Sequence, residues 1–217
     1  MRSILATGEL YHIFNRGVEH RQIFLCKNNY KRAIETIKFY QYNPKLKFTD
    51  FKNLTIEQRE KILQEIHKLP KIVEIICYCL IPNHFHFLVK QLTDNGISIF
   101  ISKFTNSYTK YFNTSNNRDG SLLGGTFKSV WIETQEQLLH LSRYIHLNPT
   151  TSYLVKAENL EDYQWSSFNE FMGLPGFCQK EIILSEFKSP QKYKEFVLDQ
   201  ADYARTLENI KHKFLEE

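Results

Sequence analysis

The stretch Leu80-Ile81-Pro82-Asn83-His84-Phe85-His86-Phe87-Leu88-Val89 predicts a turn between two strands near the middle of the chain. Pro82-Asn83 is a turn signal, and the runs on either side of it are apolar and β-prone. The first run, Ile72 to Leu80, is strongly apolar, and the second, Phe85 to Val89, is expected to pair back on it. The sequence therefore predicts an antiparallel pair of strands at this point.

Two histidines stand at the start of the second strand. Because successive side chains of a strand point to opposite faces, Phe85, Phe87 and Val89 share a face that suits the core. His84 and His86 share the other face, one strand repeat apart, where two imidazoles are close enough to bind one ion. A pair of surface or hydrogen-bonded histidines also fits the local pattern, so both interpretations stay open at this point.

Length and composition favour a soluble globular protein. A chain of 217 residues suits one domain with an extension, or two small domains, and it is long enough for a real core. Hydrophobic residues at 42% and charged residues at 24% are ordinary, whereas aromatic residues at 14% are abundant. The net charge of +4 and the pI of about 8.7 permit a polyanionic partner but do not demand one.

The four cysteines give no sign of a metal finger. Cys26, Cys77, Cys79 and Cys178 include no Cys-x-x-Cys spacing, and the pair at 77 and 79 suits small buried side chains of a strand. The first ten residues lack the apolar region and cleavage site of a secretory signal, and no window approaches the ~20 apolar residues of a membrane span. We therefore expect a reducing cytoplasm, beside the nucleoid if the partner is DNA, and no membrane.

Hydrophobic periodicity predicts the other elements, and two helices begin with a capping box. Gln58 follows Thr55 by three residues, as Gln137 follows Thr134, which is the spacing of side chains that close the first turn of a helix. The predicted elements are strands at 10–14, 71–80, 85–89 and 127–133, helices at 30–42, 55–69, 97–113 and 134–149, the last ended by Pro149, and tail helices at 190–200 and 203–215.

The order of these elements predicts an α+β fold. A β-α-β-β-α-β succession is typical of a ferredoxin-like or RRM-like antiparallel sheet with helices packed on one face. Residues 45–69 are interpreted as a helical insertion between the first helix and the second strand, and residues 174–217 as a helical C-terminal extension. Fold class alone does not give the function.

The helix before Pro149 carries a second set of polar groups. Tyr144 and Asn148 are four residues apart and so share one face of this helix. Packed over the sheet, the helix would present Asn148 together with His84 and His86 to one metal ion. Two imidazoles and an amide oxygen suit Mg²⁺ or Mn²⁺ better than a closed zinc site. Such a set supports attack of a tyrosine on phosphorus, although a tyrosine on an apolar stripe is more often a packed core residue.

Several segments resemble the single-tyrosine HUH transposases, in their IS200-like, REP-associated tyrosine transposase branch. Pro82 to Val89 resembles the His-hydrophobe-His motif, and Tyr144-Ile145-His146-Leu147-Asn148-Pro149 is similar to the nucleophile helix. The further matching segments are Tyr11 to Gly17, Ser107 to Asn113, Gly125 to Lys128 and Trp165 to Phe168. The matches follow family order over most of the chain, so the resemblance implies a transposase domain at residues 1–173.

The resemblance also implies residue roles. His84 and His86 would be two ligands of Mg²⁺ or Mn²⁺, and Asn148 would hold the third ligand position. Tyr144 would form a 5′-phosphotyrosine bond with single-stranded, hairpin-flanked DNA and leave a free 3′-OH, so that strands are cut and rejoined without an external energy source. Tyr108 is the competing nucleophile, but it lacks a polar partner four residues further on.

Basic and aromatic side chains are the candidates for DNA contacts, because single-strand binding combines charge with stacking. Arg16, in the turn after the first strand, and Lys128, near the nucleophile helix, are the foremost. The full set is Arg16, Arg21, Lys103, Lys110, Arg118, Lys128, Trp131 and Arg143. At a net charge of +4 the electrostatic part of binding should be modest and salt-sensitive. The sequence does not fix the oligomeric state and leaves a homodimer open.

Two other functions remain open. A binding module for single-stranded nucleic acid would use the aromatic residues as stacking platforms without cutting, which would leave the two histidines and Tyr144 without a joint purpose. A metal-dependent phosphodiesterase would use the same histidines with water as the nucleophile. Formation of a covalent protein–DNA adduct separates these functions from a transposase.

Overall fold

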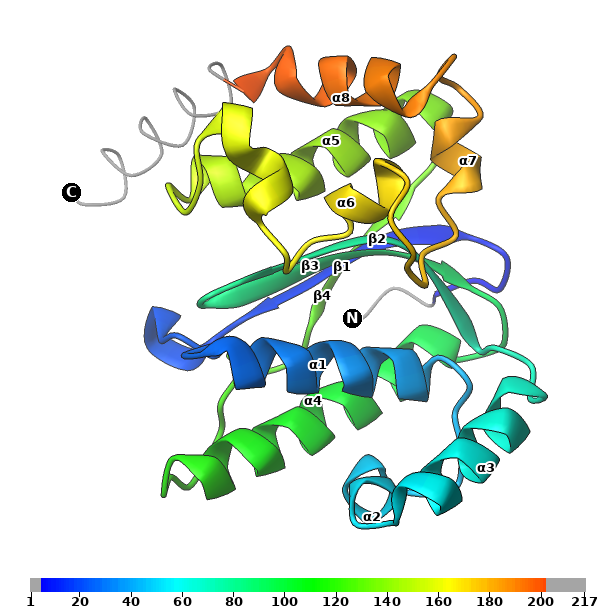
Figure 1. The fold of residues 1–217 in the computed structure, drawn as a ribbon, viewed down its shortest axis with the longest axis vertical. Coiled ribbons are helices and arrows are strands. Elements are labelled where there is room, and N and C mark those ends of the chain that lie inside the picture. The colour runs from blue at the N-terminus through cyan, green and yellow to red at the C-terminus, as the bar shows by residue number, and fades with distance from the viewer. Residues whose placement is uncertain (1–4, 202–217) are drawn as a thin grey trace. The chain divides into compact units, whose positions relative to one another are not determined.

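The computed structural model describes residues 5–201 (Figure 1). The elements in chain order are β1 (Leu10–Arg16), η1 (Val18–His20), α1 (Lys27–Tyr40), α2 (Phe48–Lys52), α3 (Ile56–His67), β2 (Val73–Ile81), β3 (His84–Gln91), α4 (Gly96–Ser115), β4 (Lys128–Ile132), α5 (Gln135–Thr151), η2 (Ala157–Asp162), α6 (Phe168–Phe171), α7 (Glu181–Leu184) and α8 (Pro190–Leu198). With α2 and α3 set aside as an insertion, the order is the predicted β-α-β-β-α-β succession followed by α5.

The four strands form one antiparallel sheet in the order β2-β3-β1-β4. This order, in which β1 and β3 are central and each has an outer neighbour, is that of a ferredoxin-like sheet. The side chains of β1 alternate between buried and partly exposed positions, whereas almost every side chain of β2 and β3 is buried. The predicted α+β fold with an antiparallel sheet is therefore confirmed.

The first of two compact units contains residues 5–74, 82–84 and 89–131. Its helices α1 and α4 pack against each other and run side by side (Figure 1). Large aromatic side chains of α4, among them Phe100, Phe104 and Tyr108, are buried at this packing, together with Ala33 and Ile37 of α1. A helix with an aromatic face of this kind contributes much of the apolar burial that stabilises a domain.

The second unit contains residues 75–81, 85–88 and 132–201. Helix α5 is at its centre and contacts η2, α7 and α8. The side chains of Thr134 and Gln137 form the predicted capping box at the start of α5, with the Thr134 hydroxyl accepting from the Gln137 amide at 3.2 Å. A cap of this kind stabilises a helix by about 1 kcal/mol, and it fixes where α5 begins.

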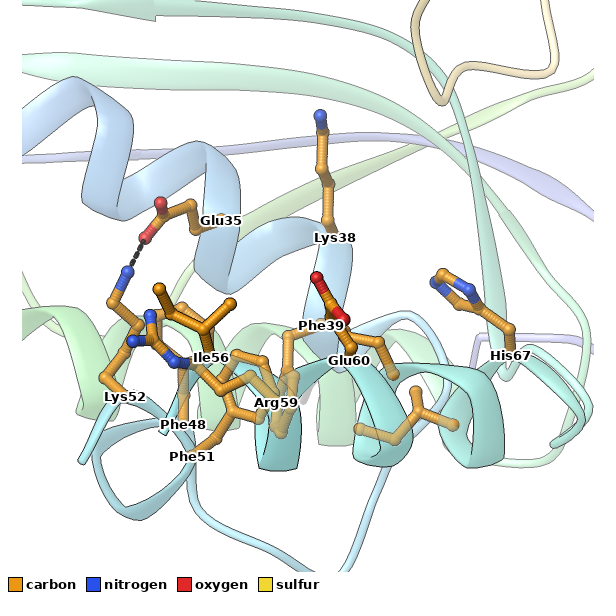
Figure 2. Close-up of a pocket in the computed structure, with 12 residues that line it drawn as sticks. Glu35, Lys38, Phe39, Phe48, Phe51, Lys52, Ile56, Arg59, Glu60 and His67 are labelled. Atoms are coloured by element: carbon orange, nitrogen blue, oxygen red, sulfur yellow. Dashed lines mark hydrogen bonds and ion pairs between the residues drawn. The ribbon is translucent and has the colours of Figure 1, made fainter. Parts of the chain in front are cut away.

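The insertion folds as two helices, α2 and α3, against α1. The predicted capping box of Thr55 and Gln58 is present at the start of α3. Together with α1 the insertion lines an open pocket of about 380 Å³, whose lining includes Phe39, Phe48 and Phe51 (Figure 2). A Lys52–Glu35 ion pair of 3.0 Å lies among the lining side chains, and Ile56 is 71% exposed. The insertion therefore has an aromatic core of its own with charged groups around it.

Three predicted boundaries differ from the structure or lie outside it. Helix α5 continues past Pro149 to Thr151, because a proline in the last turn removes only its own N–H donor, and the amide of Ser152 still bonds to the carbonyl of Asn148 at 2.9 Å. Strand β1 runs through the predicted turn to Arg16, because the Arg16 carbonyl finds a partner in the amide of Gly124 at 2.8 Å. The predicted helix at 203–215 lies outside the described residues.

The two cysteines of β2 lie where the sequence predicts small buried side chains. Cys77 and Cys79 are fully buried in β2, and burial raises the pKa of both thiols, so they are packed side chains. Between residues 5 and 201 no helix is both long enough and apolar enough to cross a membrane.

Candidate active site

The two predicted ligand histidines lie two residues apart on β3. His86 is 5% exposed and His84 is half-buried. The Nδ1 atom of His84 lies 2.6 Å from the Oδ1 atom of Asn83. Since a carbonyl oxygen only accepts, Nδ1 is the protonated nitrogen, and the lone pair of His84 is on Nε2. A neighbour that fixes the tautomer of a histidine in this way is typical of a metal ligand.

Backbone hydrogen bonds hold the turn that precedes His84. The Pro82 carbonyl accepts from the amide of Ile23 at 2.6 Å, and the Asn83 carbonyl accepts from the amide of Gly17 at 2.8 Å. Both donors belong to the segment that follows β1. Both carbonyl groups of the turn therefore have backbone hydrogen-bond partners, and these bonds fix the point where β3 begins.

Tyr144 lies on the exposed side of α5, next to a buried histidine. Its side chain is 44% exposed, and its ring centroid lies 5.4 Å from that of His86, with the two planes at 83°. Edge-to-face contact of this kind is a favoured geometry for aromatic rings. The structure thus brings the predicted nucleophile beside one of the two predicted ligands, and it leaves part of the phenol accessible to a substrate.

Asn148 lies one turn further along α5 and is 4% exposed. Its Nδ2 atom donates to the backbone carbonyl of Tyr144 at 2.9 Å. This bond orients the side-chain amide, since the nitrogen faces the helix backbone and the carbonyl oxygen Oδ1 faces away from it. Oδ1 is therefore the atom of Asn148 that would serve as a ligand.

The donor types that the sequence predicts are ones that a hard divalent ion binds. They comprise the Nε2 atom of His84, the imidazole of His86 and the amide oxygen of Asn148, with no thiolate and no carboxylate among them. Among the described residues no group of three or more histidine, cysteine, aspartate or glutamate side chains is placed to hold a metal. A set of two imidazoles and an amide oxygen leaves coordination positions for water and phosphate oxygens, which Mg²⁺ and Mn²⁺ prefer.

The far side of α5 carries a buried network that the sequence did not reveal. His146 is fully buried, with Nδ1 at 2.7 Å from the Tyr193 hydroxyl and Nε2 at 2.8 Å from the Ser167 hydroxyl. The Tyr193 hydroxyl also lies 3.1 Å from the Ser142 hydroxyl. Local sequence patterns give no signal for this network, because His146 and Tyr193 are 47 residues apart.

Burial lowers the pKa of His146 to about 3, from an unfolded value of about 6.5. Between these two values the unfolded chain binds a proton that the folded chain excludes, so the free energy of unfolding should fall as the pH decreases from 6.5, by about 1 kcal/mol per unit. We predict that His146→Gln flattens this dependence, measured by urea unfolding at pH 7, 6 and 5. His140→Gln, an exposed position of the same helix, should keep the parent slope, and equal slopes in His146→Gln and the parent would contradict the prediction.

The competing nucleophile, Tyr108, is a core residue. It is 2% exposed, and its hydroxyl donates to the carbonyl of Ile23 at 2.5 Å. Burial raises the pKa of this phenol, which makes the phenolate harder to form. Tyr108 is therefore closed to a DNA phosphate in this structure, in contrast to Tyr144.

We expect Tyr108→Phe to lower stability without changing DNA cleavage. The variant loses a buried hydrogen bond and leaves the Ile23 carbonyl without this donor, which should cost about 1–3 kcal/mol. Urea unfolding measures the stability, and single-turnover cleavage measures the rate. A Tyr108→Phe variant that keeps the parent stability but cannot cleave DNA would instead assign Tyr108 to the active site.

Three of the predicted DNA contacts are exposed residues of the first unit. Arg16 ends β1, and its Nη1 atom lies 3.2 Å from Nδ1 of His20. Lys128 begins β4 and is exposed. Trp131 is 50% exposed, and its Nε1 donates to Glu9 at 3.0 Å, which holds the indole at the surface. An indole held in this way offers a face on which a base can stack.

Lys110 and Arg118 line an open hollow at the end of α4. Arg118 donates from Nη1 to Asn113 at 2.8 Å and from Nη2 to the Ser121 carbonyl at 2.6 Å, so its guanidinium shapes the loop after α4. Lys110 is exposed. The hollow has a volume of about 620 Å³. Of the two cations, the Lys110 side chain is the more accessible to an anion.

The remaining basic candidates have internal partners. The guanidinium of Arg143 lies 3.6 Å from the centre of the Phe196 ring, and burial lowers its pKa. Arg21 donates to the backbone after β1, and Lys103 donates to the Pro44 carbonyl at 3.0 Å. These contacts give the three side chains a packing role, while their part in DNA binding stays a prediction.

The comparisons with known proteins concern the family and the fold. Residues 42–148 match the family model described as "Transposase IS200 like", and this range contains His84, His86, Tyr144 and Asn148. A solved structure of a REP-associated tyrosine transposase bound to a REP hairpin is similar in fold, with a TM-score of 0.54 at 17% sequence identity over 82% of this chain and 87% of that one. No curated protein matches the chain. Residues 42–148 of the chain are therefore similar to the IS200-like transposases, a family of enzymes that act on DNA.

Proposed function

We propose that the protein cleaves and rejoins single-stranded DNA through a covalent bond between Tyr144 and a 5′-phosphate. The observation that carries the proposal is the position of Tyr144, 44% exposed and in edge-to-face contact with the buried ring of His86. A catalytic nucleophile has to be accessible and held beside groups that stabilise the reaction, and Tyr144 meets both conditions. The other family-like tyrosine, Tyr108, is in the core.

The proposed step exchanges one phosphodiester bond for another. The Tyr144 hydroxyl loses its proton to solvent or to a nearby base and attacks phosphorus, the new Oη–P bond forms, and the bond from phosphorus to the 3′ oxygen breaks. The 3′ oxygen takes up a proton and leaves as a free 3′-OH. Because one ester replaces another of similar energy, a 3′-OH can attack the phosphotyrosine and rejoin the strand without an external energy source.

The ligands proposed for Mg²⁺ or Mn²⁺ are His84 Nε2, the His86 imidazole and Asn148 Oδ1. The bound ion would neutralise charge that develops on the scissile phosphate and orient it. The chain's own residues prepare this site, since Asn83 fixes the tautomer of His84 and the Tyr144 carbonyl orients the Asn148 amide. The proposed DNA contacts are the exposed side chains of Arg16, Lys128, Lys110 and Trp131.

The proposed substrate is single-stranded DNA that folds into a hairpin. The support is the family match, together with a structural relative that is a transposase bound to a REP hairpin. At a net charge of +4 the affinity should weaken modestly with salt, and hairpin shape and stacking should supply much of the selectivity. We place the activity in the cytoplasm, at the nucleoid, because the substrate is DNA, and a homodimer stays one of the assemblies to test.

One experiment separates the three candidate functions. The protein is incubated with a labelled single-stranded hairpin substrate and Mg²⁺ or Mn²⁺, and a covalent adduct is sought on a denaturing gel. An adduct that is lost in Tyr144→Phe supports the proposal. Binding without cleavage would point to a binding module, and cleavage that survives in Tyr144→Phe would point to a phosphodiesterase that uses water.

A further inference from the structure

Helix α5 presents different groups on its two sides. At about 100° per residue, Ser142 and His146 share one side of the helix, about 160° around from Tyr144. Both are fully buried, whereas Tyr144 is 44% exposed. Asn148 falls within about 40° of Tyr144 on the reactive side. Whatever binds Ser142 and His146 therefore sets the direction in which the nucleophile points.

A single hydroxyl from α8 binds this buried side. The Tyr193 hydroxyl lies 2.7 Å from Nδ1 of His146 and 3.1 Å from the hydroxyl of Ser142, so it joins two successive turns of α5. Tyr193 is itself fully buried, and its ring packs on Phe171 and Phe187 with centroids 4.9 and 5.1 Å away. Packing thus holds the Tyr193 ring in place, and its hydroxyl can hold α5 at a set position through hydrogen bonds.

Two further contacts anchor the same segment of α5. The ring of Phe196, one turn after Tyr193 on α8, lies under the guanidinium of Arg143 at 3.6 Å. The second ring nitrogen of His146 lies 2.8 Å from the hydroxyl of Ser167. The residues on both sides of Tyr144 in the sequence are therefore held from α8, and His146 is held from two directions.

A small rotation of α5 would be costly for catalysis. Turning a helix by about 10° moves a group that lies ~6 Å from its axis by about 1 Å. A displacement of about 1 Å between reacting groups can cost up to 10²-fold in rate. The same rotation would stretch both hydrogen bonds to the Tyr193 hydroxyl, so these bonds oppose it.

We propose that Tyr193 is a positioning residue, whose hydroxyl fixes the rotation of α5 and so holds Tyr144 beside His86. This inference rests on the proposed function, because it assigns Tyr193 a part in the reaction of Tyr144. It also gives a role to the C-terminal extension, since α8 lies within residues 174–217. As a positioning residue, Tyr193 acts through α5 and touches neither the DNA nor the ion.

The test compares two tyrosine-to-phenylalanine variants in the full chain. Tyr193→Phe keeps the packed ring and removes the hydroxyl that binds α5. Tyr163→Phe is the matched control, because the Tyr163 hydroxyl is also buried and donates to the Leu80 carbonyl at 2.7 Å, away from α5. Both variants lose one buried hydroxyl, so a general loss of stability affects them alike.

The measurements are the single-turnover cleavage rate at saturating hairpin DNA, the Kd for the same hairpin, and the midpoint of urea unfolding. We expect Tyr193→Phe to cleave about tenfold more slowly with an unchanged Kd, and Tyr163→Phe to cleave at the parent rate. Equal rates in Tyr193→Phe and Tyr163→Phe would overturn the inference while leaving the proposed function intact. Absence of an adduct in the parent protein would overturn the proposed function instead.

A second variant covers the case in which Tyr193→Phe does not fold. Ser142→Ala removes one of the two partners of the Tyr193 hydroxyl, keeps the bond to His146 and places a strong helix former in α5. Its cleavage rate should fall by a smaller factor, about two- to fivefold, at unchanged hairpin Kd. A parent-like rate in a folded Ser142→Ala protein, together with failure of Tyr193→Phe to fold, would assign Tyr193 to structure alone.

Discussion

Tyr144→Phe should abolish the covalent adduct with DNA and lower single-turnover cleavage by roughly 10³-fold or more. Phenylalanine keeps the aromatic ring, and therefore the edge-to-face contact with His86 whose centroids are 5.4 Å apart, but it has no oxygen to attack phosphorus. The variant should bind the hairpin with the parent Kd and unfold at the parent urea concentration. Denaturing gels measure the adduct, and gel-shift titration measures the Kd.

Tyr153→Phe is the matched control for this variant. Tyr153 follows α5 and is 61% exposed, so it is an accessible tyrosine close in sequence to Tyr144. If exposure near α5 were enough for reaction, Tyr153 would react as well. We expect Tyr153→Phe to form the adduct at the parent rate. An adduct that depends on Tyr153 but not on Tyr144 would identify Tyr153, which follows α5, as the nucleophile.

His86→Ala should lower metal-dependent cleavage by roughly 10²- to 10³-fold, the several kcal/mol that a bound ion supplies at a phosphate. His86 is only 5% exposed, so a water molecule does not readily take the place of its imidazole as a ligand. The side chain also lies beside Tyr144. The variant should also bind Mn²⁺ more weakly, which electron paramagnetic resonance of free Mn²⁺ measures without reference to activity. His67→Ala, an exposed histidine of the insertion, should bind Mn²⁺ like the parent.

The role of His86 could instead be to support the ring of Tyr144. In that case His86→Ala would slow cleavage but leave Mn²⁺ binding unchanged. His86→Phe separates the two roles further, because it keeps a ring against Tyr144 and removes the ligand nitrogen. Parent-like Mn²⁺ binding in both variants would contradict the assignment of His86 as a ligand.

The parts of the fold that follow local rules were predictable. The turn at Pro82-Asn83 set β2 and β3 as neighbours, and the two capping boxes placed the starts of α3 and α5, because each signal lies within a few residues of the structure it forms. Spacing also placed Tyr144 and Asn148 on one helix, one turn apart. The contact between Tyr144 and His86 was foreseen, since a helix after the last strand can pack over the hairpin.

The parts that depend on distant pairs were not predictable. His146 and Tyr193 are 47 residues apart, and nothing in either local pattern indicates that they form a hydrogen bond. The hydroxyl of the buried Tyr108 likewise donates to the carbonyl of Ile23, 85 residues away. Arg118 and Arg143 were candidates for DNA contacts as cations, but their internal partners are set by a loop and by α8. Such contacts between residues far apart in the sequence can be identified only once the chain is folded.

The most direct test of Tyr144 as the nucleophile identifies the residue that carries the DNA. The adduct formed with a short hairpin substrate is digested with nuclease and trypsin, and the modified peptide is sequenced by tandem mass spectrometry. Trypsin cleaves after Arg143 and Lys156, so Tyr144 begins a peptide that also contains Tyr153. We expect a nucleotide on the Tyr144 oxygen, linked through a 5′-phosphate. A nucleotide on Tyr153, on Tyr108 or on a residue outside this peptide would contradict it.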